Sequence, residues 1–367
     1  MSSDVTLVIV VATALAFDFT NGFHDTANSV AATISTRAMP PRVAVGMAAA
    51  LNFAGAFISL AVAATVGKGI VESAHVTSTV VFAGLIGAIA WNLATWYFGL
   101  PSSSSHALIG GVVGSAFAAA GSDAIQWEGL VEKVFVPAVI APVLALIIGI
   151  IAIVVAYRIV GGRRPGPVGR GYRLGQIVSG GMLSLSHGTN DAQKTMGIIT
   201  LALIAHGDIS ADHFHVPTWV VVSAATAIAL GTYVGGWRII RTMGSRIIKM
   251  DAAQGFSAQS AGATVILAAS HYGYPLSTTH VISGAVMGAG AGKRLSAVRW
   301  GVAGNIAAAW VLTIPAAASV GALTYGITRV FGTGAVGPLV VSALVLALLG
   351  VGFGRRLAAG RTLTAEG

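Results

Sequence analysis

Two ten-residue stretches, 166 positions apart, decide the fold of this chain. Residues 21–30 read NGFHDTANSV, and residues 187–196 read HGTNDAQKTM. Each stretch places an aspartate, Asp25 or Asp191, inside a segment that is otherwise long and apolar enough to cross a membrane. A carboxylate at the centre of a bilayer costs at least about 2.5–3.5 kcal/mol, so its recurrence at matching positions indicates a functional role.

A second pair of motifs repeats at nearly the same offset. Residues 101–106 read PSSSSH, and residues 275–280 read PLSTTH. Five apolar spans make up each half, and because five is odd, the second half has to enter the bilayer upside down. Inverted repeats with interrupted helices and re-entrant-type hairpins are typical of secondary transporters. The expected boundaries are 1–160 for the first repeat, 161–173 for a basic cytoplasmic linker, 174–330 for the second repeat, and 331–367 for an extra C-terminal span with a basic tail.

The composition assigns the chain to the membrane. Of its 367 residues, 55% are hydrophobic and only 9% are charged, with a mean hydropathy of +0.82. A soluble domain carries roughly 25% charged residues, so a soluble enzyme, a disordered regulator and an ordinary nucleic-acid binder are excluded despite the net charge of +9. There is no cysteine, which excludes disulfides and cysteine zinc sites. We expect an all-α polytopic membrane protein with no cofactor and no resident metal.

Eleven apolar segments give the expected crossings. No basic residue precedes the first one, so we expect it to be a membrane segment rather than a cleaved signal. Most of the 21 lysines and arginines fall in loops on one face, which the positive-inside rule makes cytoplasmic, with the N-terminus outside and the C-terminus inside. The segments lie near 5–36, 43–65, 77–99, 102–119, 134–157, 174–206, 217–237, 251–272, 276–291, 300–323 and 335–353.

The two hydroxyl-rich motifs predict an anion site. A proline followed by serines or threonines at the start of a helix leaves free backbone N–H groups and the positive end of the helix dipole facing one point. Such a helix start binds phosphate or sulfate, and two of them in inverted halves would face each other across the midplane. The hydroxyl groups concerned belong to Ser102, Ser103, Ser104, Ser105, Ser277, Thr278 and Thr279.

The aspartate motifs predict a site for a small cation or a proton. Asn28 follows Asp25 by three residues and adds a carbonyl oxygen on the same helical face, around a turn that we expect to be unwound. Asp18 is a third carboxylate within the first apolar span, and His24 beside Asp25 carries an imidazole that titrates near neutral pH. Asp18, Asp25 and His24 are therefore candidate proton carriers.

The two aspartate motifs differ in a way that bears on the coupling ion. A symmetric sodium site would place Asn-Asp-x-x-Asn in both halves, but His24 replaces the first asparagine and Lys194 replaces the last. Lys194 lies within one turn of Asp191 and can supply the positive charge that sodium would bring. Proton coupling follows more naturally, with or without phosphate entering as a neutral divalent-metal complex. The alternative is that Lys194 only neutralises Asp191 while sodium binds at Asp25.

Together, these motifs resemble the paired signatures of the inorganic phosphate transporter (PiT) family, in the form of the bacterial low-affinity phosphate permeases. The likeness covers nearly the whole chain. It implies an inverted-repeat fold and symport of inorganic phosphate across the plasma membrane, by a homodimer or larger homo-oligomer. It places phosphate between Ser102–Ser105 and Ser277–Thr279, and the coupling ions at Asp25, Asn28, Asn190 and Asp191.

Three other functions compete with phosphate symport. A sulfate permease of the same fold would use the same helix starts, because both oxyanions suit them. A channel would conduct without coupling, although buried carboxylates beside an anion site favour coupling. An intramembrane aspartyl protease also sets two aspartates on two spans, but neither Asp25 nor Asp191 lies in a Gly-x-Gly-Asp motif.

Overall fold

The computed structural model describes residues 2–332 and 334–365, and the side chains of residues 3–332 and 334–351. Within this part of the chain every regular element is a helix, and the only strand-like contact is an isolated bridge between Val71 and Ile125. Five helical segments are long and apolar enough to cross a membrane: Ser3–Ser35, Ser78–Phe98, Ser104–Ala124, Trp127–Val160 and Trp300–Val330. The all-α polytopic fold is confirmed, whereas the number of crossings, eleven, stays a prediction.

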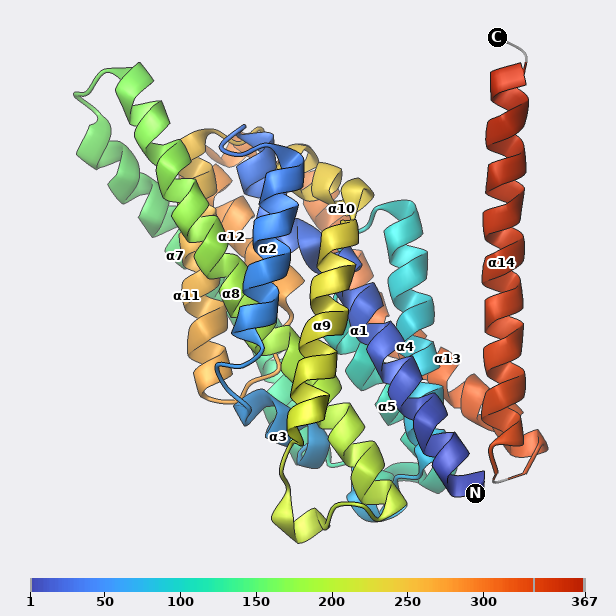
Figure 1. The fold of residues 1–367 in the computed structure, drawn as a ribbon. Coiled ribbons are helices and arrows are strands. Elements are labelled where there is room, and N and C mark those ends of the chain that lie inside the picture. The colour runs from blue at the N-terminus through green and yellow to red at the C-terminus, as the bar shows by residue number, and fades with distance from the viewer. Residues whose placement is uncertain (1, 333, 366–367) are drawn as a thin grey trace.

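The helices follow one another with short connections (Figure 1). A π-helical turn, Val131–Phe135, joins α6 to α7, and another, Thr242–Arg246, extends α10. The α-helices are α1 (Ser2–Ser35), α2 (Pro41–Gly55), α3 (Ala61–Lys68), α4 (Ser78–Phe98), α5 (Ser104–Ala120), α6 (Trp127–Leu130), α7 (Val136–Val160), α8 (Pro165–His206), α9 (Thr218–Val234), α10 (Trp237–Arg241), α11 (Ala252–His271), α12 (Thr278–Ala291), α13 (Trp300–Val330) and α14 (Val336–Ala365).

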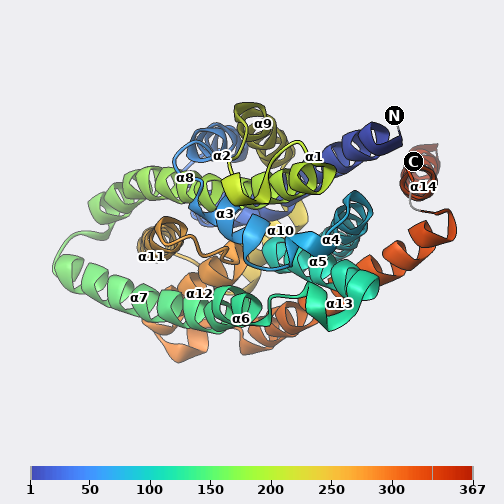
Figure 2. The ribbon, with the colours of Figure 1, turned by 90° about the horizontal axis from the view of Figure 1, so that it is seen from below.

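The helices α1 and α8, which carry the two aspartate motifs, pack against each other at the centre of the molecule. Seen from below, α2 and α9 lie along one edge of this pair, and α7 and α13 lie along the opposite edge (Figure 2). The hairpins α4–α5 and α11–α12 fill the space between them. α14 stands at one end and contacts mainly α13 (Figure 1).

Glycines within the aspartate motifs let neighbouring helices approach the centre. A Cβ at Gly22 would lie 2.8 Å from the backbone nitrogen of Thr232 on α9. A Cβ at Gly188 would lie 2.6 Å from the Cα of Asn52 on α2. Such distances are below any real Cβ contact, so only glycine permits this packing, which in a membrane has to replace the hydrophobic force between helices.

In each hairpin a contact joins the two ends that lie away from the turn, which we call the open end. In the first, the backbone N–H of Glu72 donates to the carbonyl of Ala124 at 3.0 Å, so the start of α4 lies beside the end of α5. In the second, Lys293 forms an ion pair with Asp251 at 3.0 Å, which brings the end of α12 to the start of α11. The open ends lie at opposite faces of the molecule (Figure 1). The re-entrant character of the hairpins stays a prediction.

One expectation about the backbone is wrong: α1 and α8 run without interruption through both aspartate motifs. Their polar side chains do not unwind the helix, because they bond to their own helix or to a neighbouring one. Thr26 donates to the carbonyl of Gly22 at 2.7 Å, and Thr189 donates to that of Leu185 at 2.8 Å. The break lies elsewhere, between α9 and α10, which are bent by 61°.

The predicted domain boundaries stay a prediction. α8 begins at Pro165, so much of the expected linker at 161–173 is helical, with a proline in the first turn, where its missing N–H costs nothing. The expected C-terminal span at 331–367 corresponds to α14, although residues 333 and 366–367 lie outside the described residues.

Candidate functional site

Asp25 lies at the meeting point of α1 with the tips of both hairpins. Its side chain is buried, and His24 Nδ1 lies 2.6 Å from Asp25 Oδ1. Ser104 at the start of α5 donates to the same oxygen at 3.2 Å, and Thr279 at the start of α12 donates to it at 3.4 Å. Two hairpins from distant parts of the sequence thus place hydroxyl donors on one carboxylate.

Asp191 is held by the positive charge of Lys194 one turn later on α8. Both side chains are buried, and Lys194 Nζ bonds directly to Asp191 Oδ1. The same ammonium group donates to Ser105 Oγ at 2.5 Å and to the carbonyl of Leu276 at 2.7 Å. All three donor positions of Lys194 are therefore used, which meets the requirement that a buried ion pair be hydrogen-bonded as well as paired.

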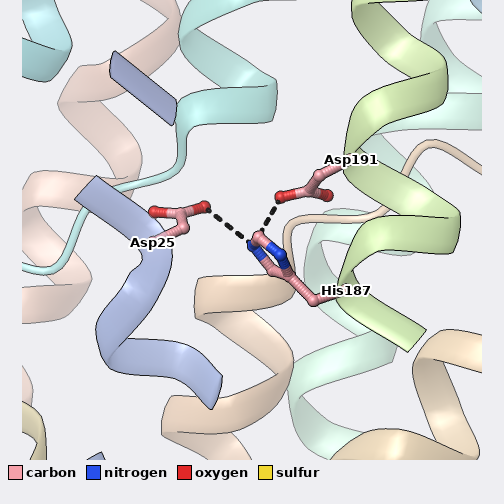
Figure 3. Close-up of side chains that lie close together, drawn as sticks. All are labelled: Asp25, His187 and Asp191. Carbon is pink, nitrogen blue, oxygen red and sulfur yellow. Dashed lines mark ion pairs between the residues drawn. The ribbon is translucent and has the colours of Figure 1, made fainter. Parts of the chain in front are cut away.

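His187 lies between the two aspartates (Figure 3). Its Nε2 is 3.0 Å from Asp191 Oδ2 and 4.0 Å from Asp25 Oδ2, while its Nδ1 lies 3.3 Å from the side-chain oxygen of Asn52. Ligand atoms of Asp25, His187 and Asp191 all lie within 4.8 Å of one another. One proton or one small cation at this point can therefore serve both carboxylates.

Two of the seven predicted anion-binding hydroxyls are N-caps. Ser103 accepts a hydrogen bond from the backbone N–H of His106 at 3.1 Å, and Ser277 accepts one from that of His280 at 3.2 Å. These caps fix the first turns of α5 and α12. The free N–H groups of both helix starts then lie beside the two aspartates.

The other five hydroxyls contact the charged side chains. Thr278 joins the two halves, because its Oγ1 lies 3.5 Å from Asp25 Oδ2 and 3.2 Å from Asp191 Oδ2. Ser102 lies 3.4 Å from His24 Nε2. Of the remaining three, Ser104 and Thr279 donate to Asp25, and Ser105 accepts a hydrogen bond from Lys194.

The tips of the hairpins also touch each other behind these hydroxyls. The rings of His106 and His280 meet edge to face at 4.7 Å, and His280 stacks on Trp310 of α13 at 4.1 Å. Neither histidine bonds to the aspartates, so both hold the tips in place.

Asn28 and Asn190 are placed differently from each other. The amide of Asn28 donates to Thr278 and Thr279, at 3.3 and 2.9 Å, which orients the start of α12. The amide of Asn190 donates to Ser270 and to the carbonyl of Tyr274, at 2.9 and 3.1 Å, near the end of α11. Asn190 thus supports the second hairpin from outside the group around Asp191.

Asp18 lies apart from the other predicted residues. It is completely buried, and among the described residues neither of its carboxylate oxygens has a hydrogen-bond partner. Its polar neighbours are Asn21 on its own helix and Thr195 on α8. Asp18 sits two turns before Asp25 on α1, in the direction of the N-terminus.

Several residues of the site were not in the predicted set. His187 precedes Asp191 by four residues, so the sequence alone places it on the same helical face. No pattern in the sequence indicated Thr95, whose Oγ1 lies 3.0 Å from His24 Nε2. No pattern indicated Gln193 either. Its side-chain oxygen accepts a hydrogen bond from the backbone N–H of Val62 at 2.8 Å, at the start of α3.

Comparison with known proteins identifies the family. The model of the phosphate transporter family matches residues 21–321. A probable low-affinity inorganic phosphate transporter of Rhizobium meliloti (strain 1021) is 50% identical over 320 residues, which cover 87% of this chain and 95% of that protein. One from Mycobacterium tuberculosis (strain ATCC 25618 / H37Rv) is 54% identical over 326 residues, covering 89% of this chain and 78% of that protein.

A solved structure shares the fold. It is described as "The sodium-dependent phosphate transporter", superposes with a TM-score of 0.74, and covers 89% of this chain and 99% of its own at 24% identity. The resemblance found in the sequence is thus confirmed, and the intramembrane protease alternative is wrong. The chain belongs to the phosphate transporter family and is a multi-pass membrane transporter rather than an enzyme.

Proposed function

We propose that this chain is a secondary symporter that moves inorganic phosphate into the cell through the plasma membrane. The observation that carries the proposal is the meeting of two hydroxyl-bearing helix starts, α5 and α12, on a buried group of two aspartates and one lysine. Backbone N–H groups and hydroxyls bind the phosphate oxygens, Lys194 supplies a positive charge beside them, and the aspartates accept hydrogen bonds from the protons that phosphate carries.

Packing between the helices supports two inverted repeats, 1–160 and 174–330. The contact of α1 with α9 has its counterpart in that of α8 with α2, and the α4–α5 hairpin has its counterpart in α11–α12. α13 packs on α5 as α7 packs on α12. We place the basic face in the cytoplasm, so that the N-terminus is outside and the C-terminus inside. The homodimer or larger homo-oligomer stays a prediction.

Phosphate suits this site better than sulfate. At neutral pH phosphate keeps one or two protons and can donate a hydrogen bond to a carboxylate, whereas sulfate has no proton to donate. Asp25 and Asp191 are hydrogen-bond acceptors when ionised, so an anion that presents a proton to them binds better than one that presents only charged oxygens. The two carboxylates therefore select against sulfate.

Uptake by the purified protein tests the substrate. Proteoliposomes should accumulate radiolabelled phosphate against its gradient, and a tenfold excess of sulfate should compete poorly because it cannot donate to the carboxylates. Empty liposomes are the control. Equal inhibition by sulfate and by unlabelled phosphate would contradict the selectivity, and uptake that no ion gradient can drive uphill would identify a channel instead.

Removing either carboxylate should abolish coupled uptake. Because each aspartate belongs to a buried hydrogen-bonded group, Asp25→Asn and Asp191→Asn should each lower the uptake rate at least about 30-fold. Asp191→Asn should also lower the unfolding temperature, since it leaves Lys194 buried without its partner. The measurement is uptake per milligram of monodisperse protein, with the exposed Asp212→Asn as control. A folded variant that transports at the wild-type rate would remove its aspartate from the site.

Protons are the coupling ion that the charges of the site favour. Asp25, Asp191 and Lys194 together carry one net negative charge when all three are ionised. Protonation of His24 and His187 changes this to one net positive charge, which matches a singly charged dihydrogen phosphate ion. The site loaded with phosphate is then neutral, and the two protons and one dihydrogen phosphate ion that move together carry one net positive charge.

Asp18 is the third proposed proton carrier, and it lies on α1 on the side of Asp25 that we place toward the outer face. A proton on its carboxyl removes the cost of a buried charge without a partner. Thr195 on α8 and Asn21 connect its surroundings to the helices that hold Asp25 and Asp191. We therefore assign Asp18, His24 and Asp25 as proton carriers and Lys194 as a fixed positive charge.

Two other cargoes or ions remain as alternatives, each with an observation in its favour. Asp25, His187 and Asp191 bring oxygen and nitrogen ligands within 4.8 Å of one another, so phosphate could enter as a complex with a divalent metal held by these side chains. Sodium coupling is suggested by the solved transporter of similar fold, which is described as sodium-dependent. In this chain, however, the ammonium group of Lys194 bonds to Asp191 where a sodium ion would need oxygen ligands.

Ion replacement tests the coupling. Uptake should rise as the external pH falls, collapse with a protonophore, and be unaffected when choline replaces sodium. Lys194→Asn, which restores the symmetric Asn-Asp-x-x-Asn pattern, should lose sodium-free uptake and gain a response to sodium. The exposed Lys249→Asn is the matched control. Strict sodium dependence of the wild-type protein at a constant proton gradient would overturn proton coupling.

A further inference from the structure

A second polar pocket opens on the face where most of the basic loops lie. It has a volume of about 360 Å³ and lies where α4 ends and α10 begins (Figure 1). Its lining includes three arginines, Arg238, Arg241 and Arg246, which define what we call the arginine pocket, together with the aromatic residues Tyr97, Phe98 and Trp237. Neither the family nor the transport function accounts for it.

We propose that the arginine pocket binds a singly charged phosphate group, either the phosphodiester headgroup of an anionic lipid or free inorganic phosphate. No aspartate or glutamate lines the pocket. Among the residues whose side chains are described, none forms an ion pair with Arg241 or Arg246. Planar guanidinium groups match phosphate oxygens in pairs, and they are the usual side chains for phosphate recognition.

The aromatic residues place the pocket at the membrane interface. Tyr97, Phe98 and Trp237 are 49%, 70% and 48% exposed, respectively, in the isolated chain. Aromatic side chains exposed beside basic ones are typical of the headgroup level, and basic pockets between membrane helices at the cytoplasmic surface bind anionic lipid headgroups. A lipid can therefore reach the arginines from the side, and free phosphate can reach them from the water.

A similar turn at the opposite end of the molecule has different neighbours. The tip of the second hairpin turns at Gly273 as the first turns at Gly99, both with positive φ. A Cβ at Gly273 would contact Ala61 and Thr65, whereas one at Gly99 would contact Arg238. The same kind of turn thus packs against alanine on one face and against arginine on the other.

The pocket is joined to the phosphate site through the tip of the first hairpin. Arg238 donates to the carbonyl of Tyr97, and Thr242 donates to that of Gly99 at 2.9 Å. Thr95 and Ser102, on either side of this turn, both contact His24 in the central site. An anion bound to the arginines therefore lies beside the turn between α4 and α5. This turn positions Thr95 and Ser102 against His24 in the central site.

Binding of a soluble lipid tests the proposal. Full-length protein in neutral detergent is titrated with dihexanoyl-phosphatidylglycerol, and the double variant Arg241→Gln/Arg246→Gln is compared with Arg42→Gln/Arg158→Gln. The control pair is exposed on the same basic face but lies outside the pocket. The pocket variant should weaken binding at least about tenfold, and the control should stay within about twofold of wild type. Arg238 is left in place because it bonds to the hairpin.

Two further arms identify the source of the anion. Displacement of the lipid by inorganic phosphate would mean that both share the pocket, whereas no displacement would mean that it takes the lipid headgroup alone. Equal affinity of the pocket and control variants, or binding of dihexanoyl-phosphatidylcholine as tightly as of the glycerol lipid, would overturn the proposal. If the double variant does not elute as a single species, Arg246→Gln alone is compared with Arg158→Gln under the same criteria.

Discussion

The burial of two carboxylates at the crossing of α1 and α8 is the constraint on which the rest of the structure depends. Neither Asp25 nor Asp191 can keep its charge in an apolar interior without partners. Lys194 balances one of them, His187 stands between both, and hydroxyls from two hairpins complete their hydrogen bonds. The hydroxyl partners come from α5 and α12, and His187 of α8 faces Asp25 on α1, so the charges fix how these helices pack.

The two hairpins supply hydroxyl donors to the buried carboxylates and at the same time form the substrate site. A helix that started at either surface would leave its N–H groups in water, whereas α5 and α12 start inside the protein beside the aspartates. Their N-terminal N–H groups, which have no partner within the helix, are thereby available to an anion. The negative carboxylates, the fixed lysine and the two helix starts give one site that binds both an anion and protons.

Sequence reasoning predicted the class of protein, the paired motifs and their meeting, because each depends on residue types at fixed spacing. It failed where the outcome depends on contacts between helices. Asp25 and Asp191 were expected on unwound turns, but their helices continue because the polar groups bond to their own helix or to a neighbouring one. Asn190 bonds to the end of α11, which no local pattern indicates. His187 shares a helical face with Asp191, and only the crossing of α1 and α8 brings it to Asp25 as well.

A crystal structure with arsenate, a phosphate analogue whose anomalous scattering marks its position, tests the central claim most directly. The account predicts an anomalous peak within hydrogen-bond distance of Ser104 and Thr278, between the starts of α5 and α12 and beside Asp25 and Asp191. A structure that binds arsenate elsewhere, with no peak between the two helix starts, would contradict it.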